Sequence, residues 1–290
     1  MLAIRSILCP VDFSEQSREA LMWATLIAKR RNSQLTILTV IDPALARLHA
    51  DFEADPALHE FVDATLSEPV QQELKLRIKV EVGNASEKIL ETCNQEDVDL
   101  VVMGTQGLGG LRKRMLGSTT QRVLRGIKKP LLAIPKGVGI ELESNKTPAD
   151  YLGRILVATD FLEGSSAAMP WAAELAEDLA VPLVFAHVVQ PIVVPRRWRR
   201  LIEGVDEQNV ADAQRRLERF SAGFGNASTQ HDVSLGEPAE SIASLAAVHN
   251  ARMIVMGLNN KADSRTRGPG SIACRVLYNT HVAILVVPPR

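Results

Sequence analysis

Runs of apolar residues alternate along the chain with stretches in which apolar residues recur every three or four positions. In the first half, the apolar runs predict strands at 4–10, 34–40, 76–82, 98–103 and 130–135. The helical spacing predicts helices at 15–31, 84–96 and 118–126, and a less regular one within 56–74. Strands that are apolar on both faces are typical of a buried parallel sheet. The pattern therefore predicts a doubly wound α/β fold.

The fold class predicts where a ligand binds in such a sheet. Ligands bind beyond the carboxyl ends of the strands, where the strand order reverses. Asp12 follows the first predicted strand and Gly104 follows the fourth. In a sheet of order 3-2-1-4-5, which is common for five parallel strands, these two ends flank the crevice.

The second half of the chain repeats the first. Residues 5–24 align with 153–172 at an offset of 148, so that Asp12 falls on Asp160. Further on, residues 82–89 align with 235–242 at an offset of 153, and the order of the matches is kept. Duplication explains both the matches and the length. We expect two five-stranded domains, 1–136 and 151–290, joined by a polar linker at 137–150.

Each repeat ends in an apolar strand that would lie at the edge of its sheet, Leu131 to Ile134 and Ala283 to Val287. Exposed apolar edges aggregate unless they are covered. We therefore expect the two strands to pair antiparallel across a pseudo-two-fold axis within one chain, as an intramolecular pseudo-dimer. A homodimer of the whole chain stays open.

A glycine-rich loop, MGTQGLGGLRKRMLGSTT, follows the fourth strand. It has no lysine before Ser118, so it is not a P-loop, and the first strand lacks the glycines of a dinucleotide fingerprint. The spacing Gly104-x2-Gly107-x9-Gly117-Ser118 puts bare backbone and a helix N-terminus after a buried strand, which favours binding of a phosphate. The alternative is structural: Gly104 only ends a strand and Ser118 is only an N-cap.

Several segments resemble universal stress proteins of the tandem type, and the resemblance covers both halves outside the linker. The segments are PVDFS, VGNASEKIL, LVVMGTQGLGG, GSTTQRVL and PLLAIP. The resemblance implies a 3-2-1-4-5 sheet of the Rossmann-like, adenine nucleotide alpha hydrolase-like kind. It also implies ATP, ADP or AMP in the crevice, with Mg²⁺ held through the phosphates in some members. The usual role is stress response and regulation, with weak or absent hydrolysis.

The resemblance also assigns roles to residues of the first repeat. Asp12 would accept hydrogen bonds from the ribose or adenine, although a helix N-terminal acid is an equally good interpretation. The full set of ATP-binding candidates is Pro10, Val11, Asp12, Val40, Met103, Gly104, Gln106, Gly107, Gly117, Ser118 and Thr119. Arg112, Lys113 and Arg114 could close over the phosphates. No catalytic residue is assigned.

The second repeat departs from the motif. Its candidate site is Thr159, Asp160, Val188, Met256, Gly257, Gly270 and Ser271. Asn260 replaces the second glycine, and Pro269 has no N–H to donate. His187 stands one residue before Val188. We expect this domain to be a degenerate, structural partner. The alternative is a second nucleotide site, since Lys261, Arg265 and Arg267 could still attract an anion.

Composition and net charge limit the classes of partner that the chain is expected to bind. The net charge is −1, so no global field attracts nucleic acid or a membrane, and neither is expected as a partner. A local basic cluster at 195–200, PRRWRR, could still touch an anionic partner or lipid. The three cysteines are far apart, which fits a reducing, cytoplasmic location. The histidine spacing predicts no metal site.

Two alternatives to nucleotide binding without turnover remain: a slow ATPase or phosphoryl-transfer enzyme, and a ligand-free structural module.

Overall fold

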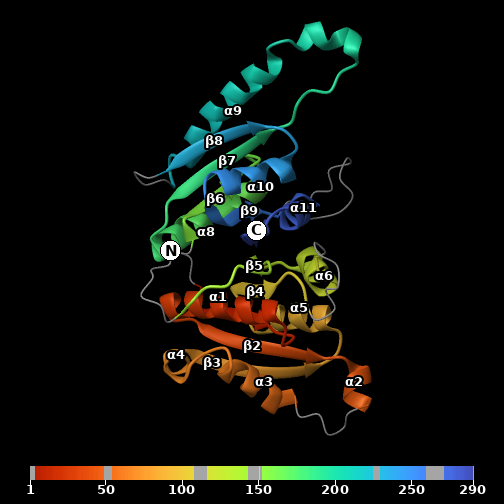
Figure 1. The fold of residues 1–290 in the computed structure, drawn as a ribbon, viewed down its shortest axis with the longest axis vertical. Coiled ribbons are helices and arrows are strands. Elements are labelled where there is room, and N and C mark those ends of the chain that lie inside the picture. Colours follow the sequence, from red (N-terminus) through yellow and green to blue (C-terminus); the bar gives the residue numbers. More distant parts are fainter. Residues whose placement is uncertain are drawn as a thin grey trace. The chain divides into compact units, whose positions relative to one another are not determined.

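The structure is a computed structural model of the chain, and it describes residues 4–48, 54–107, 116–142, 150, 152–224, 229–258 and 271–289. By its contacts the chain divides into two units. The first comprises Met1–Asn145 and His281–Val286, and the second comprises Lys146–Thr280 and Val287–Arg290. Figure 1 shows strands and helices alternating along the chain in both units.

The first unit is built from five parallel strands with helices between them. The strands are β1 (Ser6–Pro10), β2 (Gln34–Ile41), β3 (Lys75–Val82), β4 (Leu100–Gly104) and β5 (Leu131–Ile134). The helices are α1 (Glu15–Arg31), α2 (Pro43–Leu48), α3 (Ala54–Asp63), α4 (Glu68–Gln72), α5 (Ala85–Gln95) and α6 (Ser118–Gly126). The strand order is β3-β2-β1-β4-β5, so the predicted 3-2-1-4-5 order is confirmed.

Local chemistry explains where these elements begin and end. Consecutive residues of β1, β4 and β5 are buried, because both faces of the sheet are covered. The side chain of Ser14 caps α1 by accepting a hydrogen bond from Ser17 N, and Asn32 ends the helix in the left-handed conformation at φ 53°. The less regular region at 56–74 is divided between α3 and α4. The short α2 was not predicted.

The second repeat has the same plan. Its elements are β6 (Arg154–Ala158), α8 (Glu163–Leu179), β7 (Leu183–Val189), the 3₁₀ helix η1 (Arg196–Ile202), α9 (Val205–Ser221), β8 (Gln230–Leu235), α10 (Pro238–Val248), β9 (Ala251–Gly257), α11 (Ser271–Asn279) and β10 (Ala283–Val287). In the numbering of the repeat, the order β8-β7-β6-β9-β10 is again 3-2-1-4-5. The second repeat is thus a doubly wound α/β domain, as predicted.

All of the last strand except Val287 is grouped with the first unit. β10 pairs antiparallel with β5, with Leu285 opposite Leu132. All four residues of β5 and all five of β10 are buried. The predicted antiparallel pairing is confirmed, and it covers the apolar edge of β5. The pseudo-two-fold axis stays a prediction.

The start of the predicted linker packs on the first unit. Val138 and Ile140 are buried, and the indole Nε1 of Trp23 donates a hydrogen bond to the carbonyl of Val138 at 2.7 Å. The carboxylate of Glu19 accepts from Gly137 N. The domain boundaries stay a prediction, but residues 137–140 are anchored to α1.

Candidate functional site

In the first unit, two chain segments leave the sheet side by side at the point where the strand order reverses. β1 pairs with β2 on one side and with β4 on the other. Pro10, Val11 and Asp12 follow β1, and residues 104–107 follow β4. Val11 N donates to Leu38 O at 2.8 Å, which holds this segment beside β2. The predicted juxtaposition is therefore present.

Asp12 and Gly107 lie in direct contact, although 95 positions separate them in the sequence. A Cβ added to Gly107 would lie only 2.3 Å from Oδ2 of Asp12. The other carboxylate oxygen, Oδ1, accepts from Ser14 Oγ at 2.6 Å and from Ser14 N at 3.2 Å. Gly107 is therefore required for the carboxylate to take this position. Phe13, between Asp12 and Ser14, has a φ of 65°, which is rare for a large side chain.

The N-terminus of α6 lies against the loop that leaves β4. Gly117 N donates to Thr105 O at 2.7 Å, and Thr120 Oγ1 donates to Gly104 O at 2.9 Å. α6 begins at Ser118, and its N-cap is Gly117 without a side-chain cap. The alternative that Ser118 is the N-cap is wrong. The first-turn amides of a helix have no intrahelical partner, so this end of α6 favours an anion.

Gly104 has a packing role that the sequence interpretation did not include. A Cβ on Gly104 would lie 3.0 Å from the Cβ of Gln16 in α1. The matching Gly257 in the second repeat is more constrained, because its Cβ would lie 2.2 Å from the backbone of Gly164 in α8. Both glycines therefore let a helix approach a central strand closely.

The remaining candidates of the first repeat are described by their position and burial alone. Met103 is buried in β4, and Val40 is half-buried near the end of β2. Gln106 and Thr119 are half-buried, and Ser118 is exposed at the start of α6. Arg112, Lys113 and Arg114 lie outside the described residues.

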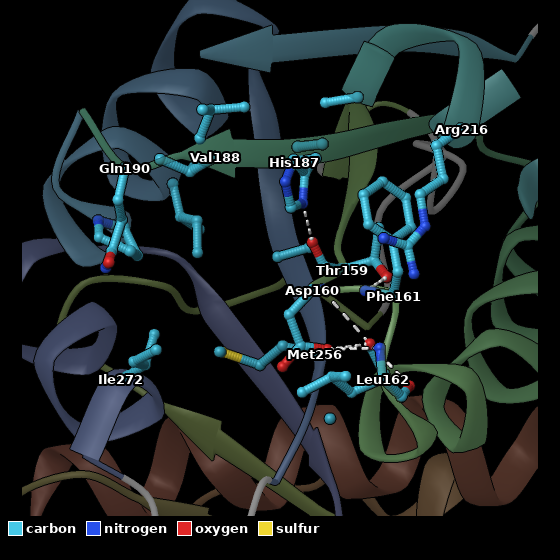
Figure 2. Close-up of a pocket in the computed structure, with 18 of the residues that line it drawn as sticks. Thr159, Asp160, Phe161, Leu162, His187, Val188, Gln190, Arg216, Met256 and Ile272 are labelled. Carbon is cyan, nitrogen blue, oxygen red and sulfur yellow. Dashed lines mark hydrogen bonds between the residues drawn. The ribbon is translucent and has the colours of Figure 1, made fainter. Parts of the chain in front are cut away.

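The second repeat contains a cavity of about 650 Å³ at the corresponding position. Five of its predicted site residues line the cavity: Thr159, Asp160, Val188, Met256 and Gly257. Thr159, Asp160, Val188 and Met256, which Figure 2 labels, lie at or just after the carboxyl ends of β6, β7 and β9. Ser271 begins α11. Gly270, Asn260 and Pro269 lie outside the described residues. The motif departs from the first repeat here, but a cavity of ligand size is present.

One wall of this cavity is a stack of three side chains. The rings of Phe161 and His187 lie 4.3 Å apart, and the guanidinium of Arg216, on α9, lies 4.3 Å from the centre of the Phe161 ring. Nδ1 of His187 bonds the carbonyl of Thr159 at 2.7 Å (Figure 2). Burial lowers the pKa of His187, and the bond to Thr159 opposes this shift. A neutral imidazole that bonds a carbonyl through Nδ1 carries its proton there.

The first repeat makes the same backbone contact with a smaller residue. Thr39, which matches His187 at the offset of 148, donates from Oγ1 to Val11 O at 3.0 Å. Phe161 matches Phe13, and both have positive φ, at 61° and 65°. Sequence reasoning missed the stack because Arg216 lies in α9, which has no fixed alignment to the first repeat. The paired Asp-Phe dipeptides are the signal that could have drawn attention to Phe161.

Comparison with known proteins decides the family. The family model described as the universal stress protein family matches residues 3–135 and again 152–288. The chain belongs to the universal stress protein family. A universal stress protein of Mycolicibacterium smegmatis is 23% identical over 98% of this chain and 97% of its own length. A shorter one from Methanocaldococcus jannaschii is 30% identical, over 46% of this chain and 82% of its own.

Solved structures show the same fold for this tandem universal stress protein. A universal stress protein from Archaeoglobus fulgidus has a TM-score of 0.63 at 20% identity, over 98% of this chain and 96% of that one. A putative one from Pseudomonas aeruginosa has a TM-score of 0.67 at 18% identity, over 99% and 94%.

The described residues contain no group of three or more His, Cys, Asp or Glu side chains placed to hold a metal ion. Among those same residues, no helix is long and apolar enough to cross a membrane. The first unit combines a helix N-terminus with one carboxylate, an arrangement that can grip an anion and a hydrogen-bond donor together.

Proposed function

We propose that this tandem universal stress protein binds an adenine nucleotide, ATP or its products ADP and AMP, in its first unit. Its role would be regulation in a stress response, in the cytoplasm, with little or no turnover. The observation that carries the proposal is the contact of Gly107 with Asp12 beside the N-terminus of α6. It supports a site with an acceptor at one end and an anion-binding helix end at the other.

The proposed placement of the nucleotide follows from these two ends. The phosphates would lie near Gly117, Ser118 and Thr119, where the first-turn amides of α6 and the helix dipole favour negative charge. Gly117 N itself is held by Thr105 O. Asp12 would accept hydrogen bonds from the nucleoside. A Mg²⁺ ion would be held through the phosphates rather than by side chains.

Slow turnover follows from the same placement. Phosphoryl transfer needs a held metal, an oriented nucleophile and charge stabilisation. If Asp12 grips the nucleoside, it does not activate water at the γ-phosphate. The competing proposal is a slow ATPase, which steady turnover near the median enzyme rate of ~10 per second would favour.

We propose that the second unit binds nucleotide more weakly than the first. Its cavity could admit a ligand, but its altered motif removes a glycine and an N–H from the phosphate end. The proposal therefore expects about one nucleotide per chain, since only the first repeat keeps all three glycines. A ligand-free module would bind none. The β5–β10 pairing makes a homodimer unnecessary for covering β5.

The test is nucleotide stoichiometry by calorimetry on the full chain. Gly117→Val puts a branched side chain where phosphate oxygens would meet bare amides, and its Cβ would lie 3.2 Å from Thr105 O. We expect about one ATP per chain in the wild type and none in this variant. The matched control, Gly270→Val, should keep about one. Two equivalent sites, or loss only in the control, would show that the wrong repeat has been chosen.

A further inference from the structure

An arm of the second unit carries exposed apolar side chains. The arm joins β7 to α9 through residues 190–204 and contains η1. Figure 1 shows it, in blue-green, extending away from the strands of that unit. Ile192, Val193 and Trp198 are 40%, 92% and 48% exposed. Three large apolar residues in water within seven positions indicate a surface that meets a partner.

The same arm carries a cluster of positive charge. Arg196, Arg197 and Arg200 are exposed, and within the part of the chain that the structure describes none of them forms an ion pair. Residues three apart share a side of a 3₁₀ helix, so Arg197 and Arg200 lie together. The guanidinium of Arg197 also lies 5.4 Å from the centre of the Trp198 ring.

The base of the arm is held in place. Ile192 N donates to Oδ1 of Asp206, at the start of α9, at 3.3 Å. Trp198 N donates to Pro195 O at 2.8 Å, which closes the first turn of η1. Pro191 and Pro195 fix two further φ angles. The apolar and basic side chains are therefore presented with less conformational entropy to lose on docking.

We propose that this arm docks on an anionic lipid surface. Tryptophan is enriched at the membrane–water interface, arginines near an anionic leaflet are attracted to it, and apolar side chains enter the acyl boundary. A nucleic acid would satisfy the arginines but would leave Ile192 and Val193 in water. The near-zero net charge of the whole chain predicted no membrane partner. Net charge is a sum over the whole chain, whereas the positive charge of the arm is concentrated within a few residues.

The experiment is co-sedimentation of the full chain with vesicles of phosphatidylglycerol and phosphatidylcholine, and with phosphatidylcholine alone. Binding should need the anionic lipid and weaken with salt. The double variant Arg197→Glu/Arg200→Glu should lower partitioning at least about tenfold. Trp198→Ala should lower it about threefold through the lost apolar area. All variants keep the fold by circular dichroism, because the changed side chains are exposed.

Two matched controls lie in the same unit. Arg215→Glu/Arg219→Glu changes the net charge equally on exposed positions of α9, and Phe224→Ala removes a ring that is 39% exposed. Both should bind vesicles like the wild type. Equal losses in arm and control variants, or no binding to anionic vesicles, would overturn the proposal. So would arm-dependent binding of a polynucleotide or of a second chain without vesicle binding. ATP stoichiometry should be unchanged throughout, which separates this test from that of the proposed function.

Discussion

At the residue scale, the two repeats use one backbone contact in two ways. Thr39 and His187 both bond the main chain after the first strand of their repeat. The imidazole of His187 in addition stacks on Phe161 and forms part of the wall of the cavity in the second repeat. Histidine at the position where the first repeat has threonine puts a titratable group in a partly buried position. The second repeat has therefore gained a pH-sensitive contact that the first lacks.

The lowered pKa of His187 predicts a pH dependence of stability. Its value in the folded chain lies below the ordinary 6.5, so just below pH 6.5 the unfolded chain binds more protons. The stability of the second unit should be complete above about pH 6.5 and should fall as the pH drops through this window. His187→Thr should flatten the decline. Urea unfolding from about pH 7.5 to 5.5 measures it, with the exposed His59→Gln as control. An unchanged slope in His187→Thr would contradict the expectation.

At the element scale, each repeat brings its first helix close to its fourth strand through a glycine. α1 packs on β4 and α8 packs on β9. The contact is tighter in the second repeat, where a Cβ on Gly257 would lie 2.2 Å from the backbone of Gly164, whereas a Cβ on Gly104 would lie 3.0 Å from the Cβ of Gln16. Neither contact can be relieved by rotating a side chain, so the shorter distance at Gly257 means that the second contact tolerates less.

Alanine at these two glycines should therefore have unequal effects. Gly257→Ala must displace α8 from β9, which we expect to cost about 3 kcal/mol of unfolding free energy, at the upper end for overpacking. Gly104→Ala needs a shift of a few tenths of an ångström and should cost about 1 kcal/mol. Urea unfolding of both variants measures the difference. Equal costs would mean that α8 and α1 yield equally.

The elements were largely predictable from sequence, and the site only in part. Apolar periodicity located β1 to β5 and α1, α5 and α6, because burial on both faces leaves a direct mark on the sequence. The short α2 has no such mark. The spacing of Gly104, Gly107 and Gly117 identified the glycine-rich loop after β4 in the sequence. The contact of Gly107 with Asp12 could not be predicted in the same way, because it depends on β1 lying beside β4 in the sheet. The Phe161–His187–Arg216 stack depends on packing of α9, which no local pattern encodes.

At the scale of the whole molecule, the first unit is completed by the end of the chain. β5 has β4 on one side and β10 on the other. Leu131, Leu132, Ala133 and Ile134 are each at most 1% exposed. Without β10, this apolar edge would face water or another chain.

Removal of β10 should therefore cause association. A chain that ends at Thr280 should form dimers or larger species through the open edge of β5, measured by sedimentation velocity. A chain that ends at Pro288 keeps β10 and should behave as the full chain does. A Thr280-terminated chain that sediments as a monomer would show that β5 is covered in another way.

The position of β10 also bears on how the protein is made. About 150 residues separate β5 from β10, and ribosomes add roughly 5–20 residues per second. The N-terminal half therefore waits about 8–30 s, after its own strands have emerged, for the strand that closes it. During that interval the apolar edge of β5 is unpaired on every nascent chain of a polysome. Neighbouring chains on one messenger would then compete with the correct partner, so translation speed and chaperone access should influence the yield of native protein.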